Sequence, residues 1–182
     1  PKNVWGPEFE DIFVYPMYDD SKVAMEITVA EGVSKIAWEV IDNGSVIASG
    51  SADALEAGKV FKTTETIENF KPWNVNTPYL YKFRTVLTVN GEDKECTIRF
   101  GMRKFSIMKD ADGYPRLALN NKPYFQKGLL DQGYWPESQL TPPTDEAMIF
   151  DIQKMKDLGF NMLRKHIKVE PEIFYHLCDR LG

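Results

Sequence analysis

The sequence predicts an immunoglobulin-like β-sandwich followed by an incomplete α/β segment. Apolar residues alternate with period two through residues 11–108, whereas from residue 109 onward short apolar strands alternate with segments of helical spacing. About seven short strands in roughly 100 residues are typical of such a sandwich. We therefore place a sandwich domain at residues 1–108 and an α/β domain at residues 109–182, joined by an exposed polar connection.

Two hairpins define the first half. Each has an Asn-Gly pair at its turn between alternating apolar runs, the strongest short-range hairpin signal. They span residues 36–47 and residues 81–100, and further strands are expected at residues 12–18, 22–30 and 60–67. This half contains no helix of convincing length.

The second half opens with turn signals on both sides of residues 115–119, followed by an expected apolar strand at residues 124–130. A helix is predicted next, with Thr144 as its N-cap and Gly159 as its stop. A further helix follows Pro171, because proline is favoured in the first turn. Its apolar residues are Phe174, Leu177, Cys178 and Leu181.

Residues 159–171, with the sequence GFNMLRKHIKVEP, form the most informative segment. We expect a short apolar strand there to deliver Asn161, Arg164 and His166 together into the loop that follows. Because α/β folds build their sites at the carboxyl ends of parallel strands, we interpret Arg164 and His166 as site residues. A solvated basic loop is the alternative, since two lysines are close by in the sequence.

A second candidate segment follows the expected strand at residues 124–130. It contains Asp131, Gln132, Tyr134 and Trp135. Aromatic faces stack on pyranose rings, and carboxylates or amides bond sugar hydroxyls, so this loop is a candidate for sugar binding. Packing of its aromatic side chains in the core or at its rim is the alternative.

The other histidine and the two cysteines have structural interpretations. His176 falls within the last predicted helix, which favours a structural or surface role, and Cys96 and Cys178 lie on apolar faces as buried free thiols. No HExxH motif, paired-cysteine spacing, glycine-rich phosphate loop or GxSxG motif occurs. We therefore expect no metal ion and no cofactor.

Composition excludes several partners. The 27 acidic and 22 basic residues give a formal net charge of -5 without a basic run, which excludes nucleic acid. No apolar stretch approaches the roughly 20 residues of a membrane span, and no signal-peptide pattern opens the chain. We expect a soluble chain without a membrane partner. Its compartment stays open, with a periplasmic or secreted parent whose signal lies outside these residues as one alternative.

Four segments together point to one family. They are residues 73–81 (WNVNTPYLY), 99–103 (RFGMR), 119–128 (LNNKPYFQKG) and 151–164, in which Lys154, Gly159, Asn161 and Arg164 occupy family positions. The chain resembles the family-2 glycoside hydrolases, which include β-galactosidases, β-glucuronidases and β-mannosidases. The first two segments resemble parts of that family's immunoglobulin-like domain, and the last two resemble the start of its TIM barrel.

The resemblance implies that residues 109–182 are the amino-terminal part of a TIM-barrel catalytic domain, truncated in this chain. It also implies a retaining, exo-acting and β-galactosidase-like parent that hydrolyses terminal β-glycosidic bonds with two glutamates. The family's acid/base glutamate follows an asparagine, and no Asn-Glu pair occurs here, so we expect no catalytic residue and an inactive fragment. The expected subsite residues are Asp131, Trp135, Arg164 and His166, with Arg164 orienting a catalytic carboxylate.

One departure from the family lies after Arg164. Many members have a Ser-His-Tyr-Pro type sequence there, whereas His166 lies one place nearer the arginine, so whether it occupies the family histidine position stays open. The expected partners are a carbohydrate substrate and the remainder of the barrel. Because two strands cannot close a barrel, we also expect the fragment to self-associate, through Met148, Ile152, Phe174 or Leu181.

Two other functions stay open. A non-catalytic carbohydrate-binding or adhesion module would need aromatic residues on an exposed sandwich face, and we interpret Trp38 and Trp73 as core residues instead. A dimerising structural domain is the third possibility.

Overall fold

The computed structural model describes residues 6–9 and 11–182, which divide into two compact units. The first, here the sandwich unit, comprises Pro1–Pro72 and Tyr79–Lys104. The second, here the α/β unit, comprises Trp73–Pro78 and Phe105–Gly182. The loop Trp73–Pro78 lies between two parts of the sandwich unit in the sequence but belongs to the α/β unit.

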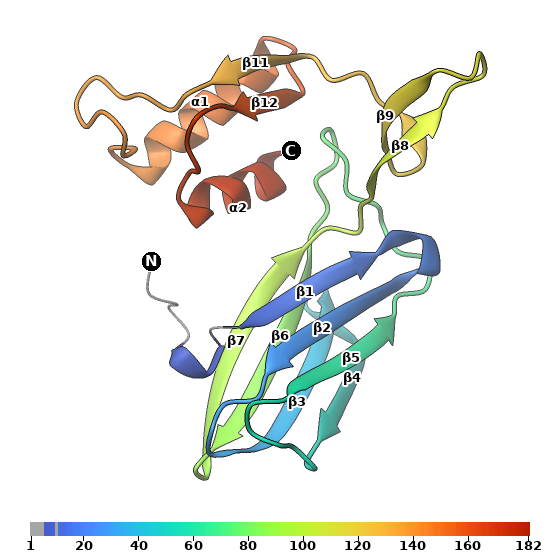
Figure 1. Ribbon diagram of the computed structural model, residues 1–182, viewed down its shortest axis with the longest axis vertical. Helices are drawn as coiled ribbons and strands as arrows, with labels where there is room; N and C mark the ends of the chain where they lie inside the picture. The colour runs from blue at the N-terminus through green and yellow to red at the C-terminus, as the bar shows by residue number, and fades with distance from the viewer. Residues whose placement is uncertain (1–5, 10) are drawn as a thin grey trace. The chain divides into compact units, whose positions relative to one another are not determined.

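The sandwich unit contains two antiparallel sheets, which confirms the predicted β-sandwich (Figure 1). One sheet has the order β1-β2-β5 and the other the order β4-β3-β6-β7. Their strands are β1 (Ile12–Met17), β2 (Lys22–Thr28), β3 (Val33–Asp42), β4 (Ser45–Ala52), β5 (Val60–Thr66), β6 (Tyr81–Val89) and β7 (Glu92–Phe100), with 3-10 turns η1 (Pro7–Phe9) and η2 (Tyr18–Asp20). The fourth strand pairs with the third, whereas the constant-type immunoglobulin order places it in the first sheet.

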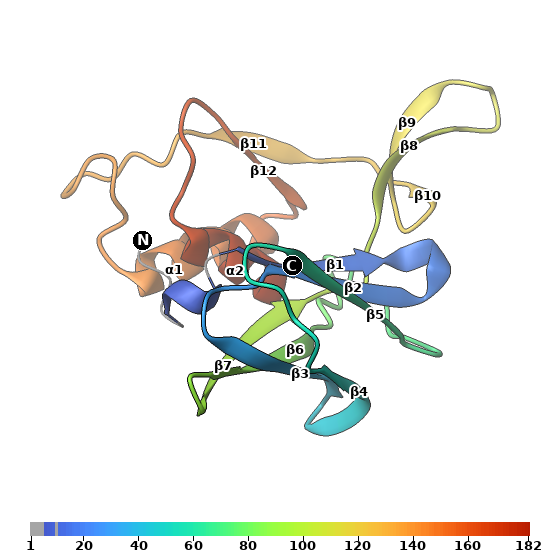
Figure 2. The same ribbon diagram turned by 60° about the horizontal axis from the view of Figure 1, so that its bottom comes forward.

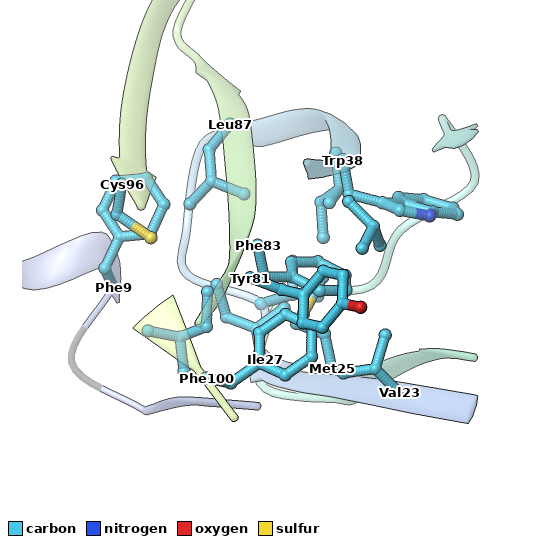
Figure 3. Close-up of a cluster of buried hydrophobic side chains, with 14 of the residues drawn as sticks. Phe9, Val23, Met25, Ile27, Trp38, Tyr81, Phe83, Leu87, Cys96 and Phe100 are labelled. Carbon is cyan, nitrogen blue, oxygen red and sulfur yellow. The ribbon is translucent and has the colours of Figure 1, made fainter. Parts of the chain in front are cut away.

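The core of this unit lies between the two sheets. Alternate residues of β6 from Tyr81 to Val89 are buried, as period two requires of a strand with one face on the core. Figure 3 shows the aromatic and aliphatic side chains of both sheets converging there, including Phe83, Phe100 and Met25.

Trp38 and Tyr81 each make a side-chain hydrogen bond within the sandwich unit. Trp38 is 9% exposed, lies against Gly50 and donates its indole N–H to Glu65 Oε1 at 2.6 Å. A Cβ on Gly50 would come within 2.3 Å of the Trp38 ring, so only glycine fits there. Tyr81 is 1% exposed, and its hydroxyl accepts a hydrogen bond from the backbone N–H of Lys71 at 2.8 Å. That bond resembles the tyrosine corner of immunoglobulin-like domains.

The α/β unit begins with a small antiparallel sheet of order β10-β9-β8, formed by β8 (Phe105–Lys109), β9 (Pro115–Leu119) and β10 (Lys122–Pro123). The next elements are β11 (Gly128–Asp131), α1 (Asp145–Asp157), β12 (Met162–Lys165) and α2 (Glu172–Leu181). β11 and β12 pair in parallel and lie side by side in both ribbon views (Figures 1 and 2). The strand expected at residues 124–130 begins only at Gly128.

The predicted helix signals are confirmed. The Thr144 hydroxyl accepts a hydrogen bond from Ala147 N at 3.2 Å, and Gly159 adopts φ +85°, the left-handed region that ends helices. Both helices share a buried cluster of Met148, Ile152, Phe174 and Leu177. The expectation that Met148, Ile152 and Phe174 would be left for contacts between copies is therefore wrong, since each is at most 5% exposed. No helix of the described residues is long and apolar enough to cross a membrane.

The loop Trp73–Pro78 packs against the end of α2 within the α/β unit. Trp73 is 5% exposed and donates its indole N–H to the carbonyl of Asp179 at 2.6 Å. Lys156 Nζ donates to the carbonyl of Val75 at 2.9 Å and also to that of Leu181. Burial lowers the pKa of the Lys156 ammonium below the ordinary value for lysine. The second unit thus depends on residues that precede β6 in the sequence.

Candidate site at the carboxyl ends of β11 and β12

The register of the two parallel strands separates the candidate residues onto two faces. Leu130 lies opposite Arg164 and Asp131 lies opposite Lys165. Successive strand residues point to opposite faces, so Leu130 and Arg164 share one face and Asp131 and Lys165 share the other. The Lys165 ammonium lies 4.7 Å from the centre of the Phe174 ring of α2, so its face is the one that the helices cover.

Arg164 lies on the uncovered face. Its side chain is exposed and makes no hydrogen bond or ion pair with any residue that the structure describes, and its neighbour Leu130 is 52% exposed. A guanidinium in this position can bind a carboxylate through two parallel hydrogen bonds.

Asn161 does not join this group, and the expectation that it would is wrong. It precedes β12, at the amino end, whereas His166 follows the carboxyl end. Its side-chain amide accepts from Lys127 N at 2.8 Å and donates to Phe125 O at 3.0 Å. The residue therefore fastens the segment before β11 to the start of β12.

Both carboxylate oxygens of Asp131 have partners inside the unit. Oδ1 accepts from Gly133 N at 2.8 Å, and Oδ2 lies 2.8 Å from Lys165 Nζ. Burial by itself would lower the pKa of the Lys165 ammonium, but its hydrogen bonds to Asp131 and Glu170 outweigh burial and raise that pKa. Asp131 thus has a partner on each carboxylate oxygen, and these contacts hold the loop and the lysine in place.

Glu170 connects the two loops that follow the strands. Its side chain is 2% exposed, and Oε1 lies 2.6 Å from Lys165 Nζ and 3.3 Å from Lys168 Nζ. Lys168 Nζ also donates to the carbonyls of Gly133 at 2.6 Å and Leu140 at 2.5 Å. Glu170 Oε2 is buried and accepts no hydrogen bond from the described residues.

His166 is tied to the loop after β11 at two points. Its backbone N–H donates to Asp131 O at 2.9 Å, and its Nδ1 lies 3.1 Å from Gln132 Nε2. With the Gln132 amide in this orientation its nitrogen donates, so Nδ1 accepts, and a neutral His166 ring then carries its proton on Nε2. This tautomer offers a donor to a bound group.

Trp135 contributes to packing in the α/β unit. It is half-buried and contacts the helical cluster that contains Phe174, and its backbone pairs with Gln139 through two hydrogen bonds of 2.8 Å. Its indole N–H is buried and donates to no described residue. Its neighbour Tyr134 is 58% exposed.

Sequence reasoning missed Lys165 and Glu170 as the centre of this network. A signal existed for the lysine, because a residue next to Arg164 in a strand must face the other side of the sheet. No local signal marks Glu170, whose partner Lys168 binds the carbonyl of Gly133 in the other loop only after folding.

The remaining sequence expectations concern cysteines and metals. Neither Cys96, which is buried, nor Cys178, which is half-buried, forms a disulfide with a described residue, and burial raises the pKa of the Cys96 thiol to about 12. His176 is exposed on α2 and lies 3.3 Å from Glu172, a helical i,i+4 pair. Within residues 6–9 and 11–182, no group of three or more potential metal ligands occurs.

Comparisons with known proteins agree on one family. The profile described as "Glycosyl hydrolases family 2" matches residues 8–103. A β-galactosidase from Pseudoalteromonas haloplanktis is 34% identical over 128 residues, which are 68% of this chain and 11% of that protein. A putative β-glucuronidase from Formosa agariphila is 28% identical over 142 residues, 77% of this chain and 13% of that protein.

Solved structures share the fold. The apo structure of Bacteroides uniformis β-glucuronidase 3 has a TM-score of 0.78 and 22% sequence identity, covering 96% of this chain and 22% of that one. A putative β-galactosidase from Bacteroides fragilis has a TM-score of 0.77 and 20% identity, covering 94% of this chain and 27% of that one.

The chain matches only a small part of each relative, but the family match covers most of the sandwich. This chain spans between 11% and 18% of the length of the curated relatives that it matches. The profile match nevertheless contains all seven sandwich strands and covers more than half of the chain. The chain therefore belongs to glycosyl hydrolase family 2.

Proposed function

We propose that this chain is part of a retaining, exo-acting β-glycosidase that hydrolyses terminal β-glycosidic bonds with a β-galactosidase-like preference. The observation that carries the proposal is the family match over the whole sandwich. Curated relatives of this chain are named β-galactosidases, and one is named a putative β-glucuronidase. In such an enzyme one glutamate protonates the leaving oxygen and a second forms the glycosyl-enzyme.

In this proposal, β11, α1, β12 and α2 are the first βα units of a TIM barrel. The parallel pairing of β11 with β12, each followed by a helix, supports that assignment. Barrel enzymes place their sites at the carboxyl ends of the strands, the end at which Asp131 and His166 lie. Arg164, on the uncovered face, would then orient a catalytic carboxylate supplied by later parts of the protein.

The four proposed subsite residues have different parts in this proposal. Arg164 and His166 retain donors that can contact a carboxylate or a sugar hydroxyl. Asp131 and Trp135 are engaged inside the α/β unit, by Lys165 and by the helical cluster, and would support the subsite from behind.

The test compares the 182-residue chain with the protein that contains it. We expect the chain alone to release no nitrophenol from any nitrophenyl β-glycoside above buffer, because it contains no Asn-Glu pair. The complete protein should hydrolyse nitrophenyl β-galactoside with retention of anomeric configuration, followed by NMR. Turnover by the chain alone that a single Glu→Gln change removes, or inversion by the complete protein, would overturn the proposal.

One observation favours the second candidate function, carbohydrate binding by the sandwich itself. Trp38 and Trp73 are buried and cannot stack on a sugar, but Phe13 and Tyr15 of β1 are 52% and 44% exposed, with near-parallel rings 6.2 Å apart. Such rings can support a pyranose face. Affinity electrophoresis on β-glycans would decide: retardation of the chain that is lost in Tyr15→Ala supports this second candidate, and no retardation excludes it.

A further inference from the structure

The carboxylate of Glu170 binds Lys168, and Lys168 in turn joins the two strand-end loops, residues 132–144 and 166–171, through the carbonyl of Gly133. We call Glu170, Lys165, Lys168 and Asp131 the Glu170 clasp. Lys168 reaches back to two carbonyls of the first loop, and Lys165 joins Glu170 to Asp131. Lys165 and Lys168, which lie on either side of His166 in the sequence, are therefore both tied to β11 or the loop after it.

The loops also approach each other too closely for a side chain to intervene. Gly133 has φ +63°, and a Cβ there would lie 2.1 Å from Glu170 Oε1 and 2.8 Å from Lys168 Nζ. Gly133 N is in turn bound to Asp131 Oδ1. The backbone of the first loop thus rests directly on the carboxylate of the second.

This arrangement is poorly explained by stability alone. Burying charges costs free energy that their attraction only partly returns, and apolar residues of similar volume often serve stability as well or better. Glu170 Oε2 adds a further cost, because it is buried without a donor from the described residues. A buried network of charged groups does fix geometry, because each ion has few alternative positions.

We propose that Glu170 is a positioning residue, whose carboxylate fastens the two loops together so that Gln132 holds His166 in the Nε2–H tautomer. This inference rests on the proposed function, since it assigns His166 as a donor of the sugar subsite. Asp131 is engaged on both oxygens, whereas Arg164 and His166 Nε2–H are two donors from which no described residue accepts. A group bound between them must supply acceptors, such as a sugar hydroxyl or a carboxylate.

The experiment uses the 182-residue chain without substrate, so its outcome does not depend on glycosidase activity. The chain has only two histidines, and their imidazole nitrogens can be separated by two-bond ¹H–¹⁵N correlation NMR. We expect the neutral form of the His166 ring to show a protonated Nε2 and an unprotonated Nδ1. Glu170→Gln, which keeps the shape but removes the charge, should move His166 toward an average of both tautomers.

Backbone exchange gives the second measurement. In Glu170→Gln, the amides of Gly133 and His166, both bound to Asp131, should exchange at least about tenfold faster, while amides of the α1 interior change little. The matched control is Glu172→Gln, two residues away, whose side chain is 69% exposed and pairs with His176. It should leave His166 and Gly133 unchanged.

Two results would overturn the proposal. One is a folded Glu170→Gln chain whose His166 spectrum and Gly133 exchange match the wild type. The other is an equal rise in exchange across the α/β unit, which is the signature of a merely structural residue. If Glu170→Gln does not fold, Lys168→Met decides, because the proposal requires faster Gly133 exchange in that variant too. An inactive complete enzyme with an intact clasp would count against the proposed function alone.

Discussion

Arg164 is an exposed side chain that is available to bind a carboxylate. It lies on the face of β12 that the helices leave uncovered and has no partner among the described residues. A guanidinium in that state is available to a carboxylate from elsewhere in the protein, for which its planar donor geometry is suited.

We expect Arg164→Ala in the complete enzyme to lower kcat/KM by a factor of about 10² or more, because carboxylate geometry is lost in the transition state. Folding should survive, since the side chain packs against nothing that α1 or α2 needs. Steady-state kinetics beside a thermal melt measure both, with Arg180→Ala on the exposed side of α2 as the control. Unchanged kinetics in a folded Arg164→Ala enzyme would reduce this loop to scaffold. His166→Ala should act more mildly.

The Tyr81 hydroxyl accepts a part-buried hydrogen bond within the sandwich unit. Tyr81→Phe leaves the Lys71 N–H without its acceptor, so we expect a loss of about 1 kcal/mol in the free energy of unfolding. Urea unfolding followed by fluorescence measures it. Tyr15→Phe removes an exposed hydroxyl and should cost nothing measurable. Equal losses in both variants would mean that the buried bond contributes nothing.

At the scale of elements, the β8–β9 hairpin depends on one carboxylate. Asp110 Oδ1 accepts from the N–H groups of Asp112 and Tyr114, and Oδ2 accepts from Arg116 Nε at 2.7 Å. The hydrogen bond from Arg116 and those from the backbone lower the pKa of Asp110 below its ordinary value. The ionised group therefore stabilises the folded turn.

The sign of the pH dependence follows from that lowered pKa. The contribution of Asp110 is complete above its unfolded pKa of 3.8 and is lost as the pH falls through the lower folded value. We expect Tyr114 amide exchange, corrected for its intrinsic pH dependence, to gain protection between these two values as pH rises. Asp110→Asn should abolish that gain, and a gain that persists in the variant would assign it to other carboxylates.

At the scale of the whole molecule, the α/β unit exposes apolar side chains that its own helices do not cover. Phe150 and Leu158 of α1 are 65% and 60% exposed, and Leu130 of β11 is 52% exposed. Surfaces of this kind favour association, and self-association of the chain stays a prediction. We expect the interface to use these residues, because Met148, Ile152 and Phe174 are buried and Leu181 is half-buried.

We expect sedimentation velocity to show a dimer or larger species that Phe150→Ser combined with Leu158→Ser shifts to monomer. The control is Val46→Ser with Ile47→Ser, which changes two exposed apolar residues of the sandwich and should leave the association unchanged. A chain that is monomeric at high concentration with an ordered α/β unit would contradict the prediction.

The sequence by itself determined those elements whose signals are local. Period-two patterns and Asn-Gly turns predict the sandwich hairpins, and Thr144 with Gly159 bounds α1, because hydrogen bonds of turns and caps form within a few residues. The alternation of strand and helix likewise indicates the position of β12, and with it Arg164 and His166.

Only the tertiary structure decided which residues from distant parts of the sequence contact one another. It places Asn161 at the opposite end of β12 from His166, assigns the loop Trp73–Pro78 to the α/β unit, and turns Asp131 toward Lys165. Glu170 becomes central because its partners Lys165 and Lys168 bind Asp131 and the carbonyls of Gly133 and Leu140, which lie about 30 residues earlier in the sequence. Such contacts depend on which distant segments pack together, and apolar periodicity shows which face of an element is buried but not which residues it will meet.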